Sequence, residues 1–237
     1  MRINAIITAG GTSSRFGNTN KLLEKINGKE VIRYTVDAFL GANVDKIIIC
    51  ANVAIMEELE KIFYSGKLKV ESGKLNNSQL STFNFQPDIE IIKGGATRQE
   101  SVYNGLKHSE CNYVLIHDGA RPMITTDLIN QAIEMVKEKK ALTVATKTID
   151  TIKEVVDGKI IKTIDRSKLY NTQTPQAFEY DLIKEAHEKL KELNFTDDAG
   201  MLEALGVDVY ILNGSYKNIK ITTKNDIDIA KIYLEQN

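Results

Sequence analysis

The sequence predicts an α/β fold, a single Rossmann-like domain with a mostly parallel twisted sheet and helices on both faces. Short β-branched runs alternate with segments of helical spacing, and glycine-rich turns follow several of the runs directly. The composition is that of a globular protein, with 42% hydrophobic and 27% charged residues. The 237 residues can bury a sizeable core, and no linker or repeat divides them. We therefore expect residues 1–237 to form one domain.

The expected strands are short apolar runs rich in isoleucine and valine. They cover residues 3–8, 46–51, 89–93, 113–118, 142–147, 207–212 and 218–222. Helices are expected where apolar residues recur on one face, as Ile32, Val36 and Phe39 do. They lie around residues 32–40, 55–63, 97–108, 126–140, 180–193 and 198–205. A closing helix should begin near Thr223, whose spacing to Asp226 fits an N-terminal cap.

Two stretches interrupt this alternation. Residues 64–88 are rich in Ser, Asn, Gly and Lys, so we expect an exposed polar excursion without a role in the chemistry. Within 148–166, two β-rich arms at 151–156 and 159–164 flank Asp157-Gly158, which is a strong hairpin signal. An isolated hairpin is marginal in water, so this one should lie on the body of the domain or on another subunit.

Charge and cysteine content exclude several classes of protein. A formal net charge of -1 provides no global field for nucleic acid or an acidic membrane, so we expect neither as a partner. Cys50 and Cys111 cannot build a disulfide framework, which favours a reducing compartment. No signal-like or bilayer-length apolar stretch is present, and we predict a cytoplasmic protein.

The first glycine-rich loop could bind an anion. It runs from Thr8 through Ala9-Gly10-Gly11 and Arg15 to Gly17, with Lys21 just beyond. Small residues let backbone N–H groups approach a phosphate, and the two cations add positive charge. The loop lacks the Walker A ending and the dinucleotide spacing. A plain strand-to-helix turn explains it about equally well.

Two further clusters follow buried strands. Gly94-Gly95-Ala96-Thr97-Arg98-Gln99-Glu100-Ser101 enters a helix, so its N–H groups and hydroxyl could meet a ligand, although an ordinary cap explains it nearly as well. In His117-Asp118-Gly119-Ala120-Arg121-Pro122, Asp118 could accept ribose hydroxyls or approach a metal, and Arg121 could hold a phosphate. We interpret His117 as a packing residue, and His108 and His187 as solvated helix residues.

Taken in order along the chain, these motifs and four later ones form a specific pattern. The later ones are Asp165-Arg166, Gln173-Thr174-Pro175-Gln176, Thr196-Asp197-Asp198 and Asn218-Ile219-Lys220-Ile221-Thr222. The whole set resembles the 2-C-methyl-D-erythritol 4-phosphate cytidylyltransferase family, a family of nucleotidyltransferases, over nearly the whole chain apart from residues 64–88. It departs from the family's usual pattern at Ser13, where glycine is common, and at Asn20 and Leu22, which flank the retained lysine.

The resemblance implies a transferase of the non-mevalonate route to isoprene units. Such an enzyme joins CTP to 2-C-methyl-D-erythritol 4-phosphate and gives 4-diphosphocytidyl-2-C-methyl-D-erythritol and pyrophosphate. The attacking phosphate is already an anion, so positioning and charge neutralisation should suffice, without a side-chain base. Magnesium would be held mainly by the CTP phosphates, and we expect no protein residue to be a dedicated metal ligand.

The resemblance also implies roles for individual residues. Catalytic residues would be Arg15, Lys21, Lys220 and Arg166. CTP would be bound by Ala9, Gly10, Gly11, Gly95, Ser101, Asp118 and Gly119. The sugar phosphate would be bound by Asp118, Arg121, Thr151, Arg166, Thr174, Thr196 and Lys220. The hairpin arm would reach across a homodimer, so that Thr151, Arg166 and Thr174 complete the partner's site.

Two alternatives remain open at this point. One is ribitol 5-phosphate cytidylyltransferase, although Gly119-Ala120 and residues 165–170 favour methylerythritol phosphate. The other is an inactive nucleotide-binding homologue, against which the retained charged residues argue. An NAD-dependent oxidoreductase is less well supported, because the dinucleotide fingerprint is missing.

Overall fold

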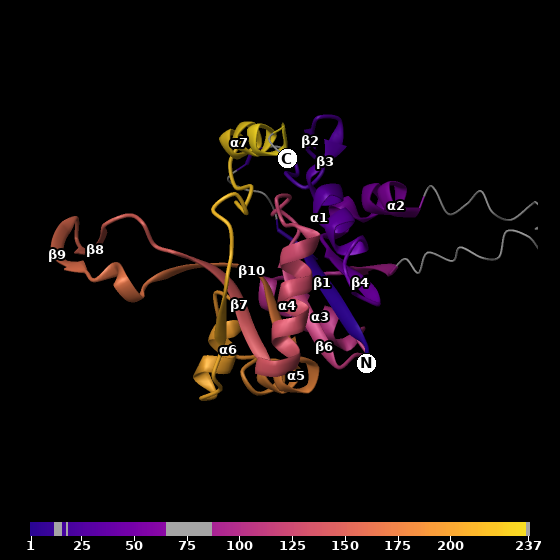
Figure 1. Ribbon diagram of the computed structural model, residues 1–237. Coiled ribbons are helices and arrows are strands. Elements are labelled where there is room, and N and C mark those ends of the chain that lie inside the picture. The colour runs from indigo at the N-terminus through magenta and orange to yellow at the C-terminus, as the bar shows by residue number, and fades with distance from the viewer. Residues whose placement is uncertain (12–15, 18, 65–86, 236–237) are drawn as a thin grey trace, which may run out of the picture.

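A seven-stranded sheet forms the centre of the molecule (Figure 1). The computed structural model describes residues 1–11, 16–17, 19–64 and 87–235. In spatial order the strands are β11 (Tyr210–Asn213), β7 (Ala141–Lys147), β10 (Tyr170–Glu179), β6 (Tyr113–Asp118), β1 (Ile3–Ala9), β4 (Lys46–Ala51) and β5 (Asp88–Lys93). Two-residue strands β2 (Lys25–Ile26) and β3 (Lys29–Glu30) form a separate small ribbon.

Strand direction and order create a switch point beside β1. This strand pairs in parallel with β4 on one side and β6 on the other, and Thr8 is in register with Asp118. The chain leaves β1 toward β4 and β5, and leaves β6 toward the opposite edge. Ligands of open α/β sheets bind where such connections diverge, at the carboxyl ends of the strands. The fold therefore places a crevice at the ends of β1 and β6.

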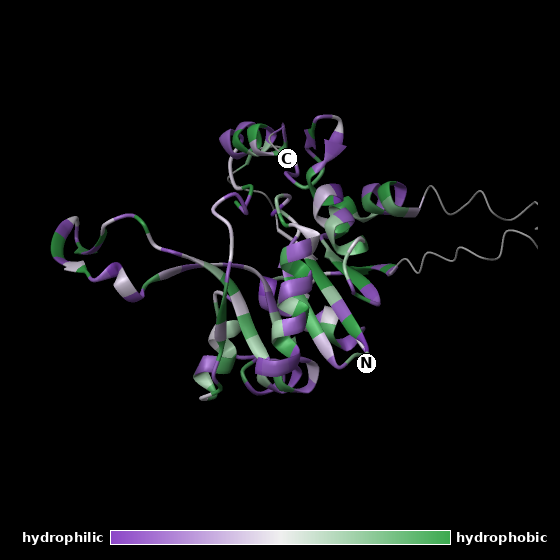
Figure 2. Cartoon of the chain, in the orientation of Figure 1, coloured by the Kyte–Doolittle hydropathy of each residue, from purple (hydrophilic) through white to green (hydrophobic). Residues whose placement is uncertain are grey.

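Helices cover both faces of the sheet, and each face has its own core. One face packs against α1 (Val31–Leu40) and α4 (Thr126–Lys139), and the other against α3 (Arg98–Lys107), α5 (Tyr180–Lys189) and α6 (Ala199–Ala204). Ile6 and Ile7 of β1 are fully buried in opposite cores, as the two-residue period of a strand requires. Figure 2 shows the central strands coloured largely as hydrophobic.

The remaining helices lie at the edges of the domain. The short 3-10 helix η1 (Val53–Ile55) leads into α2 (Met56–Tyr64), whose Leu59 and Phe63 join the core of the first face. The closing helix α7 (Asn225–Glu235) begins beside Thr223, and the backbone N–H of Thr223 donates to Asp226 Oδ2 over 2.7 Å. The predicted cap is thus confirmed. No helix among the described residues is long and apolar enough to cross a membrane.

The α/β fold, the expected strands β1, β4, β5, β6 and β7 and the helices are confirmed, but four details differ from the prediction. The strands β2 and β3 were not predicted, because two residues are too few to show a strand pattern. The antiparallel strand β10 was missed, because Pro175 interrupts it and its register shifts between Thr172 and Gln176. The strand expected at 207–212 begins only at Tyr210. No strand forms at 218–222, where single contacts such as Ile221 N to Ala120 O replace a ladder.

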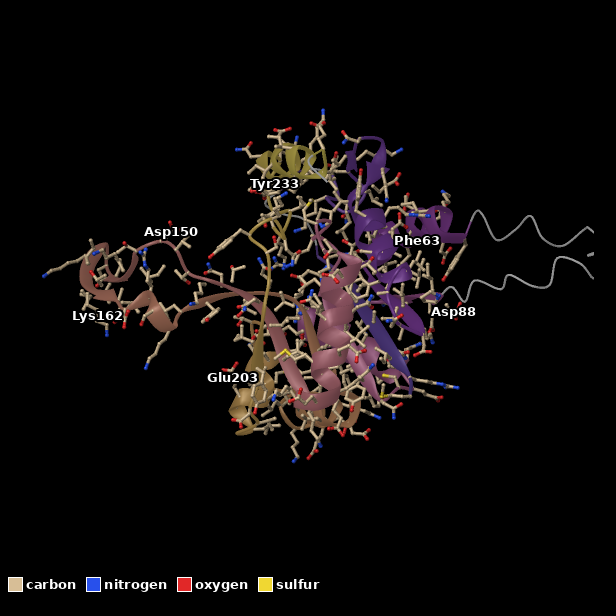
Figure 3. All side chains as sticks on the ribbon, in the orientation of Figure 1. Phe63, Asp88, Asp150, Lys162, Glu203 and Tyr233 are labelled. Atoms are coloured by element: carbon tan, nitrogen blue, oxygen red, sulfur yellow. The ribbon has the colours of Figure 1, made fainter. Side chains whose placement is uncertain are left out.

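The predicted hairpin is confirmed as an arm that projects from the domain (Figure 1). Strands β8 (Ile152–Val156) and β9 (Lys159–Ile164) meet at Asp157 and Gly158, whose φ angles of 48° and 77° suit a type I′ turn. Figure 3 labels Asp150 and Lys162 on this arm. The expectation that the hairpin could lie on its own domain is wrong, because its apolar residues are exposed.

The polar excursion expected over 64–88 lies, except at its ends, outside the described residues. Its first residue, Tyr64, ends α2, and the tyrosine hydroxyl donates to the carbonyl of Ile89 over 3.1 Å. The two ends of this stretch are therefore held next to each other beside β5.

Candidate active site

A cavity of about 370 Å³ opens at the carboxyl ends of β1 and β6, where the switch point predicts a ligand. Residues of five separate segments line it: the end of β1, the turn at Lys21 and Leu22, the start of α3 with the turn before it, the end of β6 and the stretch before α7. Eight residues predicted for the site are among them: Ala9, Gly10, Gly11, Lys21, Gly95, Ser101, Asp118 and Lys220. The fold thus brings together residues more than two hundred positions apart in the chain.

Ser101 fixes the turn that leads into α3. Its buried hydroxyl donates to Thr97 O over 2.8 Å and accepts from Gly95 N over 3.0 Å. A Cβ atom at Gly10 would come within 3.0 Å of this hydroxyl, and one at Gly95 would overlap the side chain of Glu100. Gly10 therefore lets the first glycine turn approach Ser101 closely, and Gly95 lets the second turn fold against Glu100.

Asp118 is the buried centre of charge at this cavity. Its Oδ2 lies 2.8 Å from Lys220 Nζ and 3.5 Å from Arg121 Nε, and its Oδ1 lies 3.4 Å from Arg98 Nε. Burial raises the pKa of the Asp118 carboxyl, but Lys220, Arg98 and Arg121 together outweigh burial and hold it well below its ordinary value. Asp118 is therefore ionised at neutral pH and holds three cations at the edge of the cavity.

A second buried carboxylate, Asp198, stands behind Arg98. Its Oδ2 accepts from Arg98 Nη1 over 2.7 Å, and its Oδ1 lies 3.1 Å from His187 Nε2. Burial alone would lower the pKa of Arg98, whereas Asp198 and Asp118 raise it above its ordinary value. The prediction that His187 is solvated is wrong, because its ring is buried and stacks on Tyr103. His108 is exposed as predicted, and its Nδ1 lies 2.9 Å from Glu90.

Lys21 joins the first glycine loop to the segment before α7. Its ammonium donates to Ile221 O over 2.7 Å, and Ile221 N donates in turn to Ala120 O over 2.8 Å. In the adjacent turn, the side chain of Asn20 accepts from Leu22 N over 3.0 Å, so this asparagine supports the turn. The contact between the Lys21 ammonium and the backbone of Ile221 thus closes the cavity on this side.

Other predicted residues lie beneath the cavity. Thr174 is buried, and its hydroxyl accepts from Asp118 N over 3.0 Å and contacts His117 Nδ1. The trans role expected for Thr174 does not match this position, because its side chain supports Asp118 of its own chain. His117 is a packing residue, as expected: burial lowers its pKa to about 3, so the ring is neutral. Gly119 is buried at the end of β6, where a Cβ would approach Thr8 O.

The residues predicted on the arm do not reach the cavity of their own chain. Thr151 and Arg166 are exposed, and the Arg166 guanidinium donates to the carbonyl of Ile149. Thr196 is exposed in the loop before α6. Arg15 and Ser13 lie outside the described residues.

Arg98, Thr8 and Thr222 also line the cavity, although the sequence analysis assigned them no role. For Arg98 a signal existed. It occupies the first position of α3, where the helix dipole disfavours a cation, so its presence there pointed to carboxylate partners elsewhere in the fold. No sequence pattern marked Thr8 or Thr222 as a site residue, because both line the cavity only when the end of β1 and the stretch before α7 come together in the fold.

The fold and the cavity together define a doubly wound α/β protein with a cationic, glycine-lined ligand site at its switch point. Residues 3–236 match the family model described as 2-C-methyl-D-erythritol 4-phosphate cytidylyltransferase. The chain belongs to this family, and it is therefore an enzyme of the nucleotidyltransferase class.

Individual relatives agree with this assignment. The 2-C-methyl-D-erythritol 4-phosphate cytidylyltransferase of Clostridioides difficile is 40% identical over 234 residues, covering 96% of this chain and 92% of the relative. That of Caldanaerobacter subterraneus is 37% identical over 242 residues, covering both chains completely. The crystal structure of 4-diphosphocytidyl-2C-methyl-D-erythritol synthase from Anaerococcus prevotii superposes with a TM-score of 0.82 at 30% identity, covering 99% of this chain and 96% of that one.

Proposed function

We propose that this enzyme transfers the cytidylyl group of CTP to 2-C-methyl-D-erythritol 4-phosphate, with release of pyrophosphate. The product would be 4-diphosphocytidyl-2-C-methyl-D-erythritol, in the non-mevalonate route to isoprenoid precursors. The observation that carries the proposal is the convergence of Lys21 and Lys220 with Asp118 on one glycine-lined cavity, in a chain of this family. Such a site suits a reaction between two anionic phosphates.

CTP would lie along the two glycine turns. The backbone around Gly10, Gly11 and Gly95 would approach its base and phosphates, and Ser101 would keep these turns at their close separation. Lys21 and Lys220 would neutralise charge around the α-phosphorus as the acceptor phosphate attacks in line. Arg15 is proposed to join them from the first loop. The attacking phosphate is already an anion, so no proton needs to leave it and none of the proposed catalytic residues has to act as a base.

The sugar phosphate would bind beside Asp118. This ionised carboxylate can accept hydrogen bonds from polyol or ribose hydroxyl groups, and Lys220 can contact the incoming phosphate. Arg121 and Thr196 are proposed to complete the binding surface within the same chain. Arg121 would act through the electrostatic field, because its guanidinium already contacts Asp118 and donates to Asn218 O over 2.8 Å.

Magnesium is the proposed metal ion. The described residues contain no cluster of three or more His, Cys, Asp or Glu side chains that could hold a metal. Asp118 supplies carboxylate oxygen at the cavity, and the hard oxygen ligands that Mg²⁺ prefers would otherwise come from the CTP phosphates. The ion would supply additional charge neutralisation at the triphosphate.

A homodimer through the hairpin arm is proposed as well. The arm displays an exposed apolar surface that includes Val155, Ile160 and Ile161, and a two-stranded hairpin gains stability when such a surface is covered. Thr151 and Arg166 would then reach the partner's sugar phosphate. A cytoplasmic location is also proposed, in accord with the free thiols of Cys50 and Cys111.

The direct test measures pyrophosphate release from CTP and Mg²⁺ with methylerythritol phosphate, with ribitol 5-phosphate, or without an acceptor. We expect release only with methylerythritol phosphate. Release only with ribitol 5-phosphate would keep the reaction type and change the substrate. No release with either acceptor, despite measurable CTP binding, would favour a catalytically inactive homologue.

A further inference from the structure

Two carboxylates compete for one guanidinium at the edge of the cavity. Arg98 Nη1 lies 2.7 Å from Asp198 Oδ2, whereas Arg98 Nε lies 3.4 Å from Asp118 Oδ1. A charged hydrogen bond between nitrogen and oxygen usually measures about 2.7–2.9 Å. Arg98 therefore makes a short charged hydrogen bond to Asp198 and only a long contact to Asp118.

Asp198 is fixed in place and cannot follow the arginine. Its side chain is 1% exposed, and its second oxygen lies 3.1 Å from His187 Nε2. Its backbone N–H donates to Gln176 Oε1 over 3.0 Å, which ties the start of α6 to β10. Because every one of these contacts is buried, Asp198 acts as a stationary anchor for Arg98.

The two oxygens of Asp118 have different surroundings. Oδ2 lies 2.8 Å from Lys220 Nζ, a short charged contact. The contacts at Oδ1 are both long, 3.4 Å to Arg98 Nε and 3.4 Å to Thr8 Oγ1. A hydroxyl group donates to a carboxylate at about 2.5–2.7 Å, so Oδ1 retains the capacity to accept a shorter bond from a ligand in the cavity.

We propose that Asp198 is a positioning residue that holds the Arg98 guanidinium back from Asp118, so that Asp118 Oδ1 remains available to a substrate hydroxyl group. The inference rests on the proposed function, in which Asp118 accepts from substrate hydroxyls. The Arg98 side chain is only 27% exposed and gains from an anionic partner, so without the charge of Asp198 the guanidinium closes on the buried carboxylate of Asp118. The substrate must then displace it, and the KM rises while kcat changes less.

The test is a double-mutant cycle on kcat/KM, measured by pyrophosphate release. Asp198→Asn should lower kcat/KM about 10-fold or more, mainly through KM. In the Asp118→Asn background the same change should alter kcat/KM by less than about 2-fold, because no carboxylate remains for Arg98 to close on. An equal loss in both backgrounds would show a purely structural role for Asp198 and overturn the proposal.

Asp197→Asn is the matched control. Asp197 lies in the same loop and contacts Gln176 and Gly200, but it has no contact with Arg98 among the described interactions. The variant Asp197→Asn should leave the KM values near those of the parent enzyme. A rise in KM equal to that of Asp198→Asn would contradict the proposal. If Asp118→Asn alone left activity unchanged, the proposed role of Asp118 itself would be wrong, which is a separate outcome.

A second variant covers the case in which Asp198→Asn does not fold. Changing Asp198→Asn together with Arg98→Met removes both charges of this ion pair, so neither is left without its partner. Its melting temperature should exceed that of Asp198→Asn alone, and its KM values should lie within about 2-fold of those of Arg98→Met, because Asp198 has no guanidinium left to hold. KM values about 10-fold or more above those of Arg98→Met would overturn the proposal, because Arg98 can no longer occupy Asp118 in either variant.

Discussion

Lys220 Nζ and Asp118 Oδ2 lie 2.8 Å apart, yet the lysine side chain is 43% exposed and the aspartate only 8%. The ammonium therefore stands between a buried carboxylate and the open cavity. Asp118 keeps the lysine in place, and the exposed side of the lysine remains accessible to a phosphate. This arrangement makes the lysine a preorganised charge, which needs little rearrangement when the substrates bind.

Removal of the Lys220 charge should slow catalysis strongly. We expect Lys220→Met to lower kcat by about 10²–10³-fold, because a preorganised charge of this kind acts mainly on the transition state. Steady-state kinetics with both substrates measures the effect. Lys217→Met is the matched control, since Lys217 lies in the same segment with its ammonium over the ring of Tyr233. Equal losses in the two variants would argue against a specific role for Lys220.

The close approach of the glycine turns can be tested by a rescue. Gly10→Ala should raise the Kd for CTP about 10-fold, because the new Cβ would lie 3.0 Å from Ser101 Oγ and must displace it. Adding Ser101→Ala removes that oxygen, so the double variant should bind CTP better than Gly10→Ala alone. Isothermal titration with CTP provides the measurement. A double variant no better than the single one would place the effect of Gly10 elsewhere.

A crossing arm predicts a selective defect in the use of the acceptor. Arg166→Ala should raise the KM for methylerythritol phosphate about 10-fold or more, and it should leave the KM for CTP within about 2-fold. Lys168→Ala is the matched control, because it removes a charge from the same 3-10 helix, η3 (Arg166–Lys168). Equal effects on both substrates would contradict the trans role of Arg166.

The exposed apolar residues of the arm predict concentration-dependent assembly. Ile160→Lys should shift the chain from dimer to monomer in sedimentation velocity, because a lysine would have to be buried in the interface. Val53→Lys changes an equally exposed apolar residue on η1, outside the arm, and should leave the assembly unchanged. If the parent chain sediments as a monomer throughout the micromolar range, the arm is not a dimer contact.

His117 predicts a specific acid sensitivity. Burial lowers its pKa from the ordinary value of 6.5 to about 3 in the folded state. Between these values the unfolded chain binds a proton that the folded chain does not, so stability falls as pH decreases, by at most about 1.4 kcal/mol per pH unit. His117→Asn should therefore show a smaller stability difference between pH 7 and pH 5 than the parent protein. Urea unfolding measures both, and identical differences would exclude His117 as a source of the sensitivity.

Local sequence patterns predicted much of this fold because their causes are local. Short apolar runs identified the strands β1, β4, β5, β6 and β7, and Asp157-Gly158 identified the hairpin from its turn geometry. Glycine turns after buried strands identified most of the cavity lining. By contrast, β10 depends on pairing with β6 and β7, and its own residues carry no strand signal.

The charge network could not be predicted in the same way. In the sequence, His187 lies within a polar helix and Asp198 follows that helix in a polar loop. Both therefore look like surface residues. Their burial results from the packing of α5 and α6 against α3, which brings Asp198 to Arg98 across 100 positions of the chain. Contacts of this kind depend on tertiary packing, and a short stretch of sequence does not reveal them.

The course of β10 ties the arm to the floor of the cavity. This one strand begins at Tyr170, near the root of the projecting arm, and passes through Thr174, whose hydroxyl accepts from the backbone of Asp118. The residues that leave the domain and the residues that support its buried carboxylate therefore belong to one continuous piece of backbone.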